Sequence, residues 1–415
     1  MDEQTRREFM AAAGGAAVAG MVNPQVVLAS STQDRPKQRA IVVWFAHNIC
    51  RAGSAGELVD EKYIADGLAT CVDHGINTIY WQARYVGPAI YRSKVVAPFD
   101  ASFEKLWREG TPTFDVSPAH DVQGRALADV LRRLDPYDVG LREAKRRGLT
   151  FIAQVSVFDM WFPILPDRHY EKHPEQLLTD RTQKIHATGL PCYAEPGARQ
   201  YCLAEIQELL DRGADGISLD LASHQNGFWD PKMGEKRPDA LGFNPPLVDA
   251  YKQRHGVNVL EEAFDPDQWH ALHGEFFTGF LRQVKNLLGD KPLIVGVPPC
   301  GFLGYGGNAI GVTNPNYATQ SPACRINLEW KKWLTDRIVD AVRVYTEDPS
   351  DVPTVTEMSE FGKGRFFFSR WVPVKKMDEV RRQLAQVESS NLDGYVLHEH
   401  TYFESNPKLW GIFGA

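Results

Sequence analysis

Eight short apolar runs alternate with helix-like segments along this 415-residue chain, and this alternation limits its fold more than any other feature. Several runs follow a helix-like segment that closes with glycine, as at Gly75 and Gly148, which is typical of buried parallel strands. Strand and helix repeated eight times predict the α/β class and, within it, a single-domain (β/α)8 TIM barrel over residues 40–415. Long loops are predicted after the second, fourth and fifth strands. The runs are residues 40–46, 76–84, 149–157, 213–220, 292–297, 339–345, 364–369 and 394–398.

The N-terminus has the order of a twin-arginine export signal. Arg6 and Arg7 precede an uncharged run rich in alanine and glycine, residues 11–22, which is too short and too mildly apolar to span a membrane. We expect a signal peptide over residues 1–29, cleavage after Ala29 and a disordered linker over 30–39. The mature protein is then periplasmic or extracellular. A retained amphipathic helix is the alternative.

Composition excludes some partners. A net charge of -7 without a basic stripe argues against nucleic acid, and no later segment is apolar enough for stable membrane insertion. The six cysteines show no C-x-x-C spacing, so we expect no structural zinc and no cofactor. Export permits disulfides, with Cys192–Cys202 and Cys300–Cys324 as the short-loop pairings, but buried free thiols are an equal alternative. The composition does not indicate an oligomeric state.

Asp220 ends the fourth apolar run, Gly213-Ala-Asp-Gly-Ile-Ser-Leu-Asp220. In a (β/α)8 barrel the C-terminal ends of the strands carry the active site, so Asp220 is the first candidate for a catalytic residue. A loop acid that caps the next helix is the alternative.

Four segments, taken in order, resemble the bacterial glycosyl hydrolase-like family ten. Residues 75–93 are similar to its second-strand signature and residues 135–148 to the helix before its third strand. Glu195-Pro-Gly-Ala-Arg199 with Asp215-Gly-Ile-Ser-Leu-Asp220 resembles its P-G-N-P and D-G-I-H-F-D-D block, and residues 330–345 resemble its sixth-strand segment. The resemblance implies a (β/α)8 barrel that hydrolyses glycosidic bonds in a polysaccharide or cell-wall glycan.

Three positions depart from the family pattern. Leu221 replaces a second aspartate, Pro88 replaces the aspartate of a G-D-A loop, and Tyr345 stands near a glutamine position. Each change is expected to remove a polar group from the sugar-binding face.

Glycoside hydrolysis requires a second carboxylate across the scissile bond from Asp220. One strand cannot reach both sides of a sugar, so the partner should follow another strand. Glu347, after the sixth strand, is the preferred general acid, followed by Glu399 after the eighth and Asp159 after the third. Glu357 and Glu360 lie on a loop of unknown reach.

Alternation along the second strand places Gln82 and Arg84 on one face, where they could bind sugar hydroxyls or a catalytic carboxylate. A buried arginine–carboxylate pair that only joins elements is the alternative for Arg84. If the eighth strand stays regular, either Glu399 or the flanking His398 and His400 point inward, but not both. A metal site of these histidines with His47 lacks a ligand-spacing motif, so we expect hydrogen-bonding histidines instead.

Aromatic side chains cluster in the segments expected at the barrel mouth, where flat rings suit the apolar faces of sugars. They include Trp81, Trp371, Tyr402 and Phe403, some of them expected in the core. The predicted substrate-binding set is Trp44, His47, Gln82, Arg84, Asp159, Trp161, Trp229, Tyr345, Arg370 and His400.

Two other functions stay open. The departure at Leu221 suggests a catalytically inert barrel that binds a glycan. A polysaccharide lyase would need a basic neighbour for proton abstraction beside a uronic acid, for which Arg84 with Tyr345 is the candidate.

Overall fold

Eight parallel strands close into a barrel in the order β1-β10-β9-β8-β7-β6-β3-β2. The computed structural model describes residues 36–84, 87–109, 118–158, 165–221, 241–297, 328–345 and 351–413. Each predicted apolar run overlaps one strand of this barrel, so the predicted fold class is confirmed. The strands are β1 (Gln38–Val43), β2 (Thr78–Gln82), β3 (Thr150–Ser156), β6 (Gly216–Asp220), β7 (Leu293–Val297), β8 (Ala341–Tyr345), β9 (Arg365–Trp371) and β10 (Gly394–His398).

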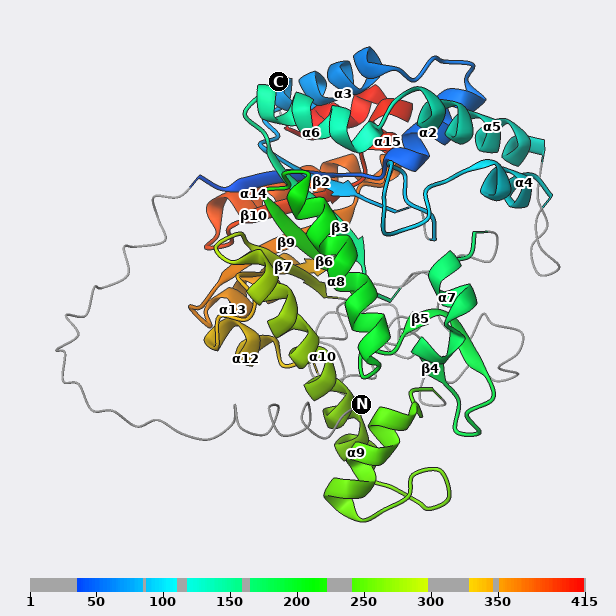
Figure 1. The fold of residues 1–415 in the computed structure, drawn as a ribbon. Helices are drawn as coiled ribbons and strands as arrows, with labels where there is room; N and C mark the ends of the chain where they lie inside the picture. The colour runs from blue at the N-terminus through cyan, green and yellow to red at the C-terminus, as the bar shows by residue number, and fades with distance from the viewer. Residues whose placement is uncertain are drawn as a thin grey trace. The chain divides into compact units, whose positions relative to one another are not determined.

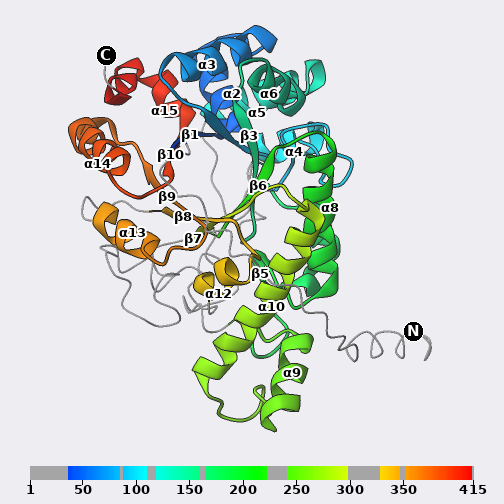
Figure 2. The same ribbon diagram turned by 90° about the vertical axis from the view of Figure 1, so that its left-hand side faces the viewer.

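Helices surround the strands (Figures 1 and 2). None of the described helices is long and apolar enough to cross a membrane. They are α2 (Phe45–Ser54), α3 (Glu61–Asp73), α4 (Ala101–Glu109), α5 (Pro118–Arg133), α6 (Pro136–Arg146), α7 (Arg168–Lys172), α8 (Pro196–Asp211), α9 (Pro245–His255), α10 (Pro266–Leu288), α12 (Trp330–Thr335), α13 (Asp351–Ser359), α14 (Met377–Ser389) and α15 (His400–Ser405). Short 3-10 helices are η2 (Pro174–Gln176), η8 (Val374–Lys376) and η9 (Pro407–Phe413).

Local signals explain where several helices begin. Asp135 and Asp265 each cap a helix whose first residue is proline, and each side chain accepts hydrogen bonds from two backbone N–H groups of the first turn. Asp60 caps α3 in the same way through the N–H of Tyr63. These caps satisfy donors that the helix itself leaves unpaired.

Some predicted boundaries are wrong. The first strand was expected to reach residue 46, but it ends at Val43 and α2 begins at Phe45. The segment between β3 and α8 also contains a two-stranded antiparallel sheet that was not predicted, formed by β4 (Leu177–Thr179) and β5 (His186–Pro191). The predicted signal peptide, most of the linker and much of the loops after β6 and β7 lie outside the described residues.

The side chains that point into the barrel form an apolar layer and, nearer the C-terminal ends of the strands, a polar one. Inside the strands, an apolar layer includes Val42, Tyr80, Ile152, Phe367 and Val396. Two residues further along several of these strands, the inward-pointing side chains are polar. The layer of side chains nearer the C-terminal ends of the strands is therefore polar rather than apolar. This parity follows from the two-residue period of a strand.

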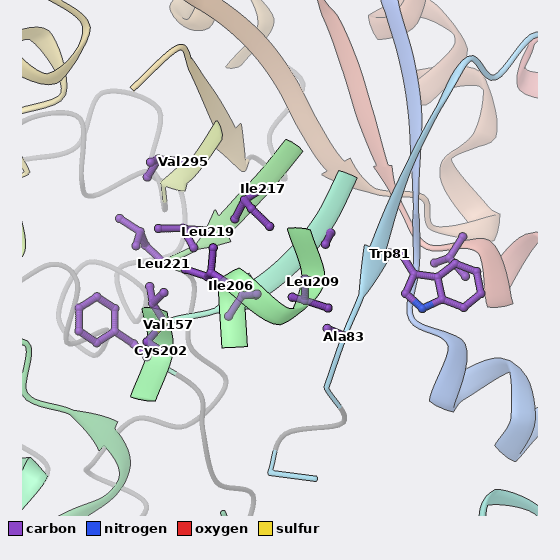
Figure 3. Close-up of a cluster of buried hydrophobic side chains, with 14 of the residues drawn as sticks. Trp81, Ala83, Val157, Cys202, Ile206, Leu209, Ile217, Leu219, Leu221 and Val295 are labelled. Carbon is purple, nitrogen blue, oxygen red and sulfur yellow. The ribbon is translucent and has the colours of Figure 1, made fainter. Parts of the chain in front are cut away.

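Outside the strands, a larger apolar cluster packs the barrel against its helices. Figure 3 shows part of it, with Ile217, Leu219 and Leu221 beside Ile206 and Leu209. Trp81 belongs to this cluster and stacks on Phe45 and Phe151, and Phe403 is also fully buried in it. Both rings are therefore core residues rather than part of a sugar platform.

The described cysteines are buried free thiols. Cys50, Cys71, Cys192 and Cys202 form no disulfide, so the suggested Cys192–Cys202 pairing is wrong. Burial raises the pKa of both Cys50 and Cys192 to about 12. Cys300 and Cys324 lie outside the described residues.

Gly140 in α6 tests the packing against Trp81. An added Cβ would lie 2.6 Å from two ring atoms of Trp81. We expect Gly140→Ala to lower the free energy of unfolding by about 1–3 kcal/mol, because overpacking outweighs the helix propensity of alanine. Gly279→Ala in α10, with no atom within 4 Å of its Cβ position, should instead gain up to about 1 kcal/mol. Urea denaturation of both variants measures this, and two changes of the same sign would contradict the packing argument.

Candidate active site

Asp220 is the last residue of β6, and its side chain is 14% exposed. Its Oδ2 lies 3.0 Å from Nη2 of Arg343, and Nε2 of Gln154 donates to the same oxygen at 3.4 Å. Asp220 lies two residues after Ser218, so both side chains point to the same face of β6. Its partners Arg343 and Gln154 belong to other strands of the same barrel. The acid is therefore held at the C-terminal end of the barrel, where the sequence analysis expected it.

Arg343 lies on β8, two strands from β6, and its side chain is 1% exposed. It crosses β7 at Gly296, where an added Cβ would stand 2.6 Å from Nη2 and 2.9 Å from Nε of the guanidinium. The guanidinium also lies over the ring of Tyr80, with 5.6 Å between its Cζ and the ring centroid. Glycine at position 296 thus leaves the space through which Arg343 reaches Asp220.

A chain of hydrogen bonds extends from this ion pair to both sides. Nη1 of Arg343 donates to Oε1 of Gln154 at 3.3 Å and to Nε2 of His398 at 3.1 Å. Gln154 in turn donates to Gln82 at 2.8 Å, and Gln82 donates to the hydroxyl of Ser156 at 3.2 Å. We call Gln82, Gln154, Asp220, Arg343 and His398 the polar layer.

A second acidic group stands where β10 ends. Glu399 is 1% exposed, and its Oε1 accepts a hydrogen bond from Nδ1 of His47 at 2.7 Å. His47 is 31% exposed, and its ring centroid lies 4.4 Å from that of Trp44, directly after β1. Nε1 of Trp44 donates to the backbone carbonyl of Arg84 at 3.2 Å.

The sequence analysis expected either Glu399 or its flanking histidines to point inward if the eighth strand stayed regular. The strand does not continue that far, because β10 ends at His398 and Glu399 is the N-cap of α15. His398 bonds Arg343, whereas Glu399 bonds His47. His400 is placed elsewhere: Nδ2 of Asn48 donates to its Nδ1 at 2.9 Å, and it lines a cavity outside the strands with Trp81 and Leu68. The structure therefore places His400 away from the side chains around Asp220.

Arg84 lies in a buried ion-pair cluster. Its Nε and Nη2 donate to the two carboxylate oxygens of Glu205 on α8 at 2.7 and 2.5 Å, and its Nη1 donates to Asp167. All three side chains are at most 2% exposed. Arg84 lies beyond the end of β2, where the strand's alternation no longer holds. The structure thus places Arg84 in the buried pair that the sequence left as an alternative.

Arg370 is also turned away from the barrel interior. It alternates with the inward Ser369 and packs under α14, where Nη1 donates to Glu379 at 3.1 Å and to Gln383. The side chain is 2% exposed. Arg370 has the opposite strand parity to Ser369, so its side chain lies on the outer face of β9 rather than inside the barrel.

The departures from the family pattern have a different meaning from the one expected. Leu221 is fully buried in the outer apolar cluster (Figure 3), so leucine at this position removes no polar group from the mouth. Pro88 is also buried. Tyr345 ends β8, but its side chain is not among those described.

Several predicted residues lie outside the described part of the chain. They are the preferred acid Glu347 together with Asp159, Trp161 and Trp229. Glu357 lies in α13, with its side chain not described, and Glu360 is exposed directly after that helix. Among the described residues, no group of three or more His, Cys, Asp or Glu is arranged to hold a metal ion.

The sequence analysis missed Arg343 and Gln154. Both could have been found from strand parity, because each is a polar residue flanked on both sides by apolar ones in a buried strand, as in Val342-Arg343-Val344. A charged residue at such a position faces the barrel interior or a covering helix, and it needs a partner there. Its partner Asp220 was already a candidate.

No protein-family model and no curated protein matches the sequence. Among solved structures, the chain is similar to the glycoside hydrolase domain of PelA from Pseudomonas aeruginosa, with 13% identity over 64% of this chain and 84% of that chain and a TM-score of 0.37. It is similar to an exo-β-N-acetylglucosaminidase from Vibrio harveyi, with 11% identity, a TM-score of 0.48, and coverage of 91% of this chain and 54% of that chain. For a β-mannanase from the blue mussel Mytilus edulis, the identity is 12%, the coverage 91% and 90%, and the TM-score 0.40. Similarities this distant carry no argument about function, which must come from the site.

The Arg84 cluster gives a stability prediction. Arg84→Met leaves Glu205 and Asp167 buried without their cation, so we expect the free energy of unfolding to fall by about 3–5 kcal/mol. Arg142→Met, which removes an exposed pair with Glu61, should cost less than about 1 kcal/mol. Equal urea midpoints for the two variants would contradict the structural role of Arg84.

Gly296 provides a test of the Asp220–Arg343 pair that leaves both residues in place. We expect Gly296→Ala to displace the guanidinium and to lower the free energy of unfolding by about 1–3 kcal/mol. Gly411→Ala, with no atom within 4 Å of its Cβ position, is the control and should change neither. A crystal structure of the Gly296 variant with the 3.0 Å contact intact would refute the crossing argument.

Proposed function

We propose that this protein is an exported glycoside hydrolase in which Asp220 is one of two catalytic carboxylates. The observation that carries the proposal is the partly exposed Asp220 at the C-terminal end of β6, held there by Arg343 of β8. Catalytic groups of (β/α)8 enzymes occupy this end of the strands. The resemblance to the bacterial glycosyl hydrolase-like family ten adds support for a polysaccharide or cell-wall glycan as substrate.

The contacts of Asp220 favour one of the two carboxylate roles. Its Oδ2 is ion-paired with Arg343 and accepts a hydrogen bond from Gln154, so that oxygen is not placed to deliver a proton to a leaving group. We therefore assign Asp220 as the nucleophile or as the base for water. The general acid is its partner.

Glu347 is the preferred partner. Neighbouring strands lie about 4.8 Å apart, so the ends of β6 and β8, two strands apart, are separated by about 10 Å. Carboxylates of glycosidases stand about 5–9.5 Å apart, a span that side chains from these two strand ends can reach. Glu399 follows β10, four strands from β6 and across the barrel, and is the second candidate.

The twin-arginine-like N-terminus supports action outside the cytoplasm, where polysaccharide substrates are found. Residues 11–22 and the small residues before position 30 have the order of such a signal. Export of a folded enzyme is part of the proposal. Cleavage after Ala29 can be checked by sequencing the N-terminus of secreted protein.

A glycan-binding barrel without catalysis is the second candidate. Its support is that both described mouth acids already have strong partners, Asp220 with Arg343 and Glu399 with His47.

Substitution of the carboxylates separates the two candidates. We expect Asp220→Asn and Glu347→Gln each to lower the release of reducing ends from a panel of β- and α-linked glycans by roughly 10²–10⁴-fold, because each removes a group that acts on the scissile bond. If Glu399 is the general acid, Glu399→Gln rather than Glu347→Gln lowers the release of reducing ends by this factor. Asp290→Asn, an exposed acid in the turn before β7, is the matched control and should retain activity.

Wild-type protein that binds a glycan but releases no reducing ends would support the binding barrel. Full activity in Asp220→Asn would remove Asp220 from the mechanism.

A further inference from the structure

The ends of β9, β10 and β1 carry a group of side chains of which only Glu399, the second candidate for the general acid, has a place in the two-carboxylate scheme. These three strands are neighbours in the barrel. We call the group the β10 rim. It consists of Trp371 at the end of β9, Glu399 and Tyr402 after β10, and Trp44 and His47 after β1.

The apolar part of the rim is an aromatic pair that reaches the surface. The ring centroids of Trp371 and Tyr402 lie 5.5 Å apart at 61°, an edge-to-face contact. Tyr402 is 42% exposed although it is a large aromatic residue. Trp371 also contacts the His398 ring at 5.3 Å. Such faces suit the C–H surface of a sugar ring.

The polar part of the rim is Glu399. Its Oε1 is bonded to His47, but its Oε2 is buried without a hydrogen-bond partner among the described residues. Leaving a buried acceptor unsatisfied is costly, and such atoms in native structures call for an explanation. The backbone N–H of Tyr402 donates to the carbonyl of Glu399 at 3.0 Å, so the glutamate adjoins the aromatic pair, and burial and the charge of Glu399 raise the pKa of the Tyr402 hydroxyl.

His47 is oriented by the same carboxylate. The 2.7 Å bond to Oε1 fixes the imidazole with a proton on Nδ1, as carboxylates do for histidines that bind a ligand through the other nitrogen. At 31% exposure the ring remains partly accessible.

We propose that the β10 rim is a binding subsite for one neutral pyranose ring of a carbohydrate chain, with the ring against Trp371 and Tyr402 and a sugar hydroxyl donating to Oε2 of Glu399. The subsite rests on the proposed function for its connection to catalysis. His398 joins the two regions, because it contacts Trp371 on one side and Arg343, the partner of Asp220, on the other.

The charge of the rim limits which sugar it accepts. An acceptor carboxylate at 1% exposure favours hydroxyl donors and repels a second carboxylate, which would be a like charge with little solvent between them. Uronic acid residues are therefore excluded, and neutral hexoses or pentoses are accepted.

Binding is measured on an Asp220→Asn background, so that no hydrolysis interferes. The probes are cellohexaose, mannohexaose, xylohexaose and hexagalacturonic acid, each titrated by isothermal calorimetry. We expect at least one neutral hexasaccharide to bind, and hexagalacturonic acid to bind at least about 10-fold more weakly than it. Trp371→Ala should weaken neutral binding by about 10-fold or more, because it removes the stacking face.

Conservative variants separate binding from folding. Trp371→Phe and Tyr402→Phe keep a ring and should retain most of the affinity, whereas Glu399→Gln should weaken neutral binding and reduce the discrimination against hexagalacturonic acid. Val72→Ala, 38% exposed in the last turn of α3, is the control and should change nothing. Thermal melting of each variant checks that it is folded.

The outcomes distinguish this proposal from the proposed function. If folded Trp371→Ala and Glu399→Gln variants bind as the parent does, or if no neutral hexasaccharide binds, the subsite is refuted. If the wild type binds through the rim yet hydrolyses none of the probes, the subsite stands and the hydrolase proposal fails.

Discussion

The ion pair between Asp220 and Arg343 is the contact on which the rest of the candidate site depends. It joins β6 to β8 across β7, and it requires that position 296 carry no side chain. The apolar layer of the barrel interior lies below it, so the guanidinium has little water to replace its protein partners. A buried cation of this kind is tolerable only with an acid and hydrogen-bond acceptors close by. Asp220, Gln154 and His398 supply them.

Three buried arginines show how position, rather than residue type, decides a role. Arg84 and Arg370 are as buried as Arg343, yet each lies against a helix and pairs with acids there. Those two pairs hold the outer layer of helices to the barrel. Arg343 alone of the three faces the interior, where it orients an acid at the C-terminal end of the strands. The same charge therefore contributes to stability in two places and to the candidate site in one.

The described part of the mouth thus contains two acidic centres with different surroundings. Asp220 belongs to the polar layer, which runs through Arg343 to His398. Glu399 belongs to a rim of aromatic rings and is bonded to His47. His398 contacts Trp371 of the rim and Arg343 of the polar layer, so one side chain connects the two regions.

The sequence by itself determined the barrel and the location of Asp220, because the strand period and the glycine stops are local signals that need no knowledge of neighbours. The alternation of side chains along β8 also predicts that Arg343 points inward, a prediction that the sequence analysis did not make. Only the tertiary structure decided that Arg84, Arg370 and His400 serve packing, that Leu221 faces the outer cluster, and that Arg343 pairs with Asp220 past Gly296. Those outcomes depend on which strands become neighbours and on where each strand ends, and both are set when the sheet closes. A partner several strands away along the chain cannot be identified before that closure.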